Sequence, residues 1–170
     1  MSTHYWSSTD SPPRLWLIVG TLFLGLTLEF LLWPNWLVKP LFPDIALLYW
    51  AVHQPRTVNF GAAVALGLLM DLAARLPLGF TALAYTMMIA LTNIIRGRFS
   101  LMGAAGQSAY VFFILACGQG VLLLLETWHS GAARPWSWSY FAPSFVSALL
   151  WFFLPVLLRA VLNVFGWRRD

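Results

Sequence analysis

Long apolar segments separated by short polar ones dominate the pattern of this chain. A helix needs about 20 apolar residues to cross the roughly 30 Å hydrocarbon core of a bilayer. Five segments reach or approach that length: Leu15–Trp33, Val58–Ala74, Pro77–Ile95, Leu101–Leu125 and Tyr140–Leu158. The pattern therefore predicts an all-α integral membrane protein.

A sixth apolar segment, Leu41–Val52, is shorter and begins among Pro40, Pro43 and Asp44. It is either a full span that starts near Trp36, or a broken, re-entrant element whose irregular backbone is sheltered by the surrounding protein. We favour the full span because an even number of spans needs no special element. The expected fold is a compact bundle of about six transmembrane helices.

Composition and charge agree with this class. Of 170 residues, 60% are hydrophobic and 9% are charged, whereas about a quarter of an average soluble domain is charged. The net charge is +4, but the cations stand singly or in pairs between apolar segments, which indicates membrane topology rather than nucleic-acid binding. The cations that flank the segments divide six to three between the two sides of the membrane, whether Leu41–Val52 spans it or is re-entrant. The side with six includes Arg96, Arg98, Arg168 and Arg169 in both cases. The C-terminus is therefore expected in the cytoplasm, and six spans place the N-terminus there as well.

The chain is expected to form one domain. A polar tail covers residues 1–13, and a single transmembrane helical domain covers 14–170. The first apolar segment continues to Trp33 without a small-residue cleavage site, which favours a retained span over a signal peptide. Cys117 is the one cysteine and lies in an apolar segment, so we interpret it as a packing residue.

Three carboxylates lie in or beside apolar segments, where a charge is costly and needs a partner. Glu29 lies near the end of the first segment and is expected to reach the headgroups, as long side chains near helix ends do. Asp71 and Arg75 are four residues apart, so either they pair on one helix face, or Asp71 points into the bundle and holds a partner or ligand. Asp44 follows Pro43, and the favoured role for a carboxylate at such a helix start is capping.

Small residues at four-residue spacing predict close contacts between helices. Gly61 is paired in this way with Ala65, and Ala63 with Gly67. Such pairs let two helix backbones approach closely, although they are common in membrane helices.

Catalysis is not expected from the motifs. His4, His53 and His129 occur singly, and the chain has no metalloprotease, serine hydrolase or phosphate-loop motif. An aspartyl pair of Asp44 and Asp71 would need the two carboxylates to share a proton, and the residues around them do not match known membrane peptidases. We therefore expect no enzyme, no cofactor and no metal ion.

The segment from Pro43 to Leu91 resembles the core of the MreD family, the rod shape-determining membrane proteins of bacteria. The matching features follow one another in order: Pro43-Asp44, Tyr49-Trp50, Pro55, a glycine-rich helix with Gly67 and Asp71, and Pro77-Leu78-Gly79 followed by Ala82–Tyr85. The length of the chain and the number of spans agree as well, but outside this middle third the agreement is in hydropathy alone.

This resemblance implies a non-catalytic component of the cell-elongation machinery, or elongasome, in the bacterial cytoplasmic (inner) membrane. Proteins of the family act with MreC, a single-span protein with a periplasmic domain, and with the MreB filament. Together these support lateral peptidoglycan synthesis by the RodA glycosyltransferase and its partner transpeptidase. MreC is therefore the main expected partner, and membrane lipids surround the bundle.

The general fold of the family is also similar to that of the substrate-capture subunits of vitamin transporters. The alternative function is therefore capture of a small molecule between the helices, although a fold does not carry a function with it.

Six spans bring the start of the second helix and the turn between the third and fourth helices to one periplasmic corner. This corner is formed by Pro43, Asp44, Asp71, Arg75, Pro77 and Gly79. We expect it either to shape a groove for the MreC helix or to be a structural join.

Overall fold

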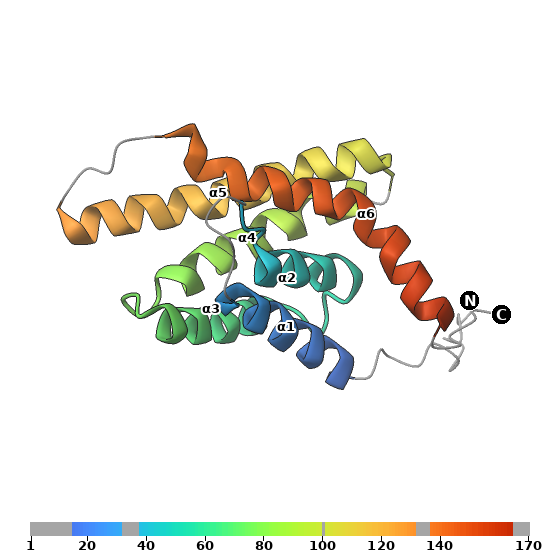
Figure 1. The fold of residues 1–170 in the computed structure, drawn as a ribbon, viewed down its shortest axis with the longest axis horizontal. Coiled ribbons are helices and arrows are strands. Elements are labelled where there is room, and N and C mark those ends of the chain that lie inside the picture. Colours follow the sequence, from blue (N-terminus) through green and yellow to red (C-terminus); the bar gives the residue numbers. More distant parts are fainter. Residues whose placement is uncertain (1–14, 32–37, 100, 132–136, 165–170) are drawn as a thin grey trace, which may run out of the picture.

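The computed structural model describes residues 15–31, 38–99, 101–131 and 137–164, with side chains up to residue 153 (Figure 1). The described elements are helices throughout: α1 (Leu15–Phe30), α2 (Phe42–His53), α3 (Phe60–Ala74), α4 (Phe80–Phe99), α5 (Ala104–Ser130), a short 3-10 helix η1 (Trp138–Phe141) and α6 (Ala142–Val164). The expected all-α class is confirmed for these residues. The predicted tail over 1–13 lies outside them.

Consecutive helices alternate in direction along the long axis of the molecule (Figure 1). The ends of α1, α3 and α5 and the starts of α2, α4 and α6 lie toward one end, on the left of the view. We call this the acidic end because Glu29, Asp44 and Asp71 belong to these helix termini. The alternation follows the predicted up-and-down order of six helical segments.

The helices differ in whether they are long enough to cross a membrane. By length and hydropathy, α5 alone among the described helices is sufficient to cross a membrane, whereas α1 and α3 are apolar but shorter. The segment with two predicted alternatives, Leu41–Val52, forms one unbroken helix of 12 residues, α2, which is about 18 Å long. It runs antiparallel to α1 rather than folding back on itself (Figure 1).

The core lies around α2 and α4. Helix α4 packs against α2, α3 and α5, and α2 packs against α1, α4 and α6. The largest fully buried apolar side chains include Leu47 and Leu48 of α2 and Met88 and Ile89 of α4. Large apolar side chains such as Phe23 are also exposed on the outside, which is typical of helices whose solvent is lipid.

Helices α3 and α4 approach each other closely at Gly67. A Cβ atom added there would lie 2.5 Å from the Ala82 backbone nitrogen and 2.9 Å from the Thr81 carbonyl carbon. These separations are far inside van der Waals contact, so only glycine allows the two backbones to lie this close. Ala63 is buried on the same face of α3.

The other predicted pair, Gly61 and Ala65, lies on the opposite side of α3 and is exposed. Within the described residues, the helix contact predicted for this pair is therefore not found.

Substituting Gly67→Ala should destabilise the bundle, because the new methyl group forces α3 and α4 apart. We expect the free energy of unfolding to fall by about 1–3 kcal/mol, measured as a lower thermal midpoint of the purified protein in detergent. Gly97→Ala is the matched control, since a Cβ at Gly97 in α4 meets nothing within 4 Å. Equal midpoints for the two variants would contradict the close contact.

Candidate functional site

The start of α4 is capped by a side chain from α3. The first amide groups of any helix lack partners within the helix. Here the Gly79 N–H donates to Asp71 Oδ2 at 2.7 Å, and the Thr81 N–H donates to Asp71 Oδ1 at 2.8 Å. Asp71 is fully buried, with 0% exposure. Both carboxylate oxygens are thus used to satisfy the backbone of the next helix, and the negative charge lies at the positive end of the α4 dipole.

The turn between α3 and α4 is shaped by its sequence, Arg75 to Gly79. Arg75 adopts a left-handed conformation with φ of 56°, which ends α3. The Leu76 N–H then donates to the Asp71 carbonyl at 2.9 Å, a bond typical of helix C-termini. Gly79 has φ of 101°, a value that favours glycine. Asp71 therefore lies where its side chain can reach across a tight turn.

The predicted pairing of Asp71 with Arg75 is not formed. Arg75 is exposed, and in the described part of the chain it makes no ion pair with Asp71. The four-residue spacing brings side chains together only while the helix continues. Because Arg75 has left the helical conformation, its side chain departs from the face that carries Asp71. Asp71 points into the bundle, as the second alternative predicted, but it holds the backbone of α4; a partner or ligand held by Asp71 stays a prediction.

Asp44 does not cap α2, so the favoured prediction for it is wrong. The Leu41 N–H, at the start of α2, instead donates to Ser147 Oγ of α6 at 2.8 Å. Asp44 lies in the first turn of α2 with 9% exposure, and its carboxylate accepts a hydrogen bond from the buried Tyr85 hydroxyl of α4. Neither Ser147 nor Tyr85 carried a sequence signal for these roles, because both contacts join distant segments.

Glu29 pairs with Lys39 beyond the end of α1, and its expected reach to the headgroups stays a prediction. Its Oε1 lies 2.6 Å from Lys39 Nζ, and the two side chains are 13% and 33% exposed, respectively. Lys39 Nζ also donates to the Glu29 backbone carbonyl at 2.7 Å. Glu29 interacts electrostatically with Asp44, while Glu29 Oε2 is buried without a hydrogen-bond partner. One buried acceptor at the acidic end therefore has no donor among the described residues.

This arrangement supports binding and positioning better than catalysis. Asp71 uses both oxygens on backbone amides, and Asp44 is engaged by Tyr85, so the two aspartates do not share a proton as an aspartyl pair would. Within the described ranges, no three His, Cys, Asp or Glu side chains gather in a way that could hold a metal ion.

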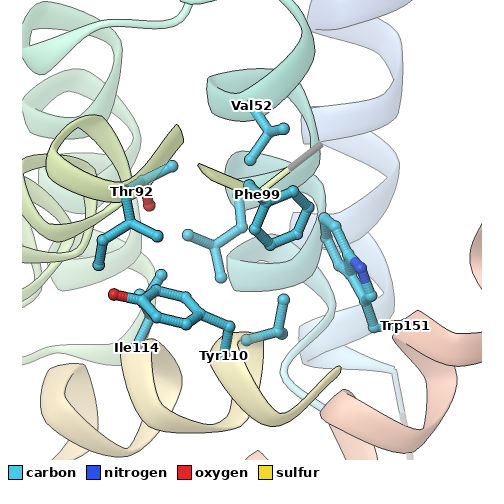
Figure 2. A pocket seen from close by; sticks show the side chains of 9 residues that line it. Val52, Thr92, Phe99, Tyr110, Ile114 and Trp151 are labelled. Atoms are coloured by element: carbon cyan, nitrogen blue, oxygen red, sulfur yellow. The ribbon is translucent and has the colours of Figure 1, made fainter. Parts of the chain in front are cut away.

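A small apolar cavity lies between α2, α4, α5 and α6 (Figure 2). Its volume is about 10 Å³, room for roughly one water molecule. Binding sites for small molecules typically enclose about 300–1,000 Å³ and contain several convergent polar groups. The side chains labelled in Figure 2 converge on this space from four helices: Val52, Thr92, Phe99, Tyr110, Ile114 and Trp151.

The capping and salt-bridge interpretations of Asp71 predict opposite effects on stability when Arg75 is replaced. Asp71→Ala should lower the free energy of unfolding by about 3 kcal/mol, since two buried N–H groups lose their acceptor, and Asp71→Asn by about half as much. Arg75→Gly should leave stability unchanged or raise it by about 1 kcal/mol, because glycine favours the left-handed conformation. Thermal unfolding in detergent measures all three variants. If Arg75→Gly destabilised the protein as much as Asp71→Ala, the capping account would be wrong.

No solved structure matches this chain, so the similarity to transporter capture subunits stays a prediction. The model of the family described as rod shape-determining protein MreD matches residues 14–161 of the 170. This match extends the resemblance of the Pro43–Leu91 segment to nearly the whole chain, including Glu29, Lys39 and Ser147 at the acidic end. The chain therefore belongs to the MreD family of rod shape-determining membrane proteins.

Proposed function

We propose that this protein is a non-catalytic component of the bacterial elongasome that binds MreC and supports lateral peptidoglycan synthesis. Membership of the MreD family makes it a rod shape-determining membrane component. The observation that carries the non-catalytic part is the state of the two buried aspartates. Both are committed to hydrogen bonds within the bundle, so neither is poised as an unpaired acid, base or nucleophile.

The dimensions of the molecule support binding through the membrane-embedded surface. The described turns between α2 and α3, α3 and α4, and α4 and α5 are only a few residues long, too short to enclose a soluble partner. The outside of α1, by contrast, exposes large apolar side chains, among them Trp16, Val19 and Phe23. A single-span partner such as MreC suits a surface of this kind. MreB, RodA and its transpeptidase join it in the larger assembly.

In this proposal, the corner of Pro43, Asp44, Asp71, Arg75, Pro77 and Gly79 holds the starts of α2 and α4 relative to each other, with Tyr85 interacting with both aspartates. Its role is to keep the acidic end rigid. The protein lies in the inner membrane with multiple passes and with both termini in the cytoplasm, so that the acidic end faces the periplasm. The cation distribution supports this orientation.

Substrate capture is the weaker proposal for this chain. A vitamin-binding subunit needs an enclosed site that is far larger than the cavity of about 10 Å³ in Figure 2. The walls of that cavity are apolar, whereas vitamins carry polar groups that a capture site must satisfy.

Controlled depletion of the protein in its native bacterium tests the proposal. Rods should widen and round up before growth stops, and lateral incorporation of new wall should fall, as measured by microscopy with a fluorescent wall precursor. A plasmid copy of the wild type should restore rods, whereas a copy carrying Asp71→Ala should restore them poorly. Cells that stay rod-shaped but grow only with an added vitamin would contradict the proposal and favour substrate capture.

A further inference from the structure

Four side chains at the acidic end form a connected polar cluster: Glu29, Lys39, Asp44 and Tyr85. We call these four the carboxylate cluster. It contains two carboxyl groups and one ammonium group, and the ammonium group of Lys39 is engaged by Glu29. Asp44 is 9% exposed and the Glu29 side chain 13%. A buried carboxylate is unfavourable unless its oxygens are paired or hydrogen-bonded.

The hydrogen bonds of the cluster show which acceptor lacks a donor. Lys39 Nζ donates to Glu29 Oε1 and to the Glu29 carbonyl, and the Tyr85 hydroxyl donates to Asp44. Glu29 Oε2 has no donor among the described residues, although it is buried. A carboxylate can accept several hydrogen bonds, so one more N–H donor, preferably a charged one, would complete this site.

The neighbouring polar groups that the structure describes do not supply the missing donor to Glu29 Oε2. Asp71 is near enough to influence Tyr85, but it is a further anion and its oxygens are already used by Gly79 and Thr81. Arg75, the cation of the adjacent turn, is exposed and forms no ion pair with Glu29 in the described part of the chain.

The cluster is also reachable from outside. Lys39 is 33% exposed, so the cluster opens to the surface beside it. Glu29 belongs to α1, which packs extensively against α2 alone among the described helices and exposes Trp16, Val19 and Phe23. A helix lying along α1 could therefore extend a long basic side chain to the cluster while its own apolar side chains cover this face.

We propose that a lysine or arginine side chain at the periplasmic end of a partner's transmembrane helix binds Glu29 and completes the carboxylate cluster. Charge complementarity selects this occupant, because Glu29 Oε2 is a buried carboxylate oxygen that has no donor among the described residues. The proposal rests on the proposed function for the identity of the partner, MreC, and adds the residue and the chemistry by which the partner is held.

Co-purification of the full chain with full-length MreC from the same membranes tests this inference. Glu29→Gln should reduce the captured MreC by about tenfold, the effect of losing one charge-assisted hydrogen bond. Lys39→Gln should capture at least as much as the wild type, because it removes the cation that already pairs with Glu29 and leaves the site more negative.

The opposite signs expected for Glu29→Gln and Lys39→Gln separate binding from folding. If both variants lost MreC equally, the ion pair would be purely structural and the proposal would be overturned. Unchanged capture by Glu29→Gln would overturn it too. If that variant also lost bound phosphatidylethanolamine, the site would belong to a lipid headgroup. A wild-type chain that captured no MreC would overturn the proposed function and this inference together.

A complementary series on MreC keeps the test decisive if Glu29→Gln does not insert. Each lysine or arginine near the periplasmic end of the MreC span is replaced singly by glutamine. At least one replacement should reduce capture by the wild-type chain about tenfold, and should add nothing in the Glu29→Gln background. If no replacement reduced capture, the proposal would be wrong.

Discussion

The architecture of the acidic end depends on one interaction: the Asp71 carboxylate accepts hydrogen bonds from the Gly79 and Thr81 amides. Inside a bilayer, a helix start cannot rely on water for its unpaired N–H groups, so another part of the protein must supply the acceptors. Gly67 is one helical turn before Asp71, and a Cβ there would collide with Thr81 and Ala82. The close approach of α3 to α4 and the cap are therefore one contact, since Asp71 reaches the amides only because Gly67 lets the backbones meet.

The start of α2 is satisfied in the same manner by a different helix. Ser147 of α6 accepts a hydrogen bond from the Leu41 amide. Tyr85 of α4 donates one to Asp44, three residues further along the chain. The Trp50 indole N–H then donates to Thr21 Oγ1 of α1 at 2.7 Å. A helix of only 12 residues is thus tied to three neighbours through polar contacts, in addition to its buried apolar face. These contacts hold α2 against three helices, and the proposed binding of a partner helix depends on that arrangement.

Several features could be predicted from the sequence because they depend on local pattern. Hydropathy indicated six helical segments, and the Pro43–Leu91 motifs indicated the family. The isolated position of Asp71 in an apolar segment indicated an important side chain. Its actual partners could not be predicted, because they depend on Arg75 leaving the helix, and a left-handed arginine has no clear sequence signature.

Contacts between distant segments explain the other differences between the sequence-based predictions and the structure. Ser147 lies more than one hundred residues from the Leu41 amide that it caps, and no local pattern pairs them. Membrane helices are apolar on both their buried and lipid-facing sides, so hydropathy does not show which side turns inward. This is why the exposed Gly61–Ala65 pair could not be distinguished from the buried Ala63–Gly67 pair.

Hydrogen–deuterium exchange at the Thr81 amide, with the protein in lipid nanodiscs, tests the central claim most directly. If Asp71 caps α4, this amide should exchange as slowly as amides in the middle of α4, such as that of Ile89, and it should become fast when Asp71 is replaced by alanine. Rapid exchange at Thr81 in the wild type, unchanged by that replacement, would contradict the account.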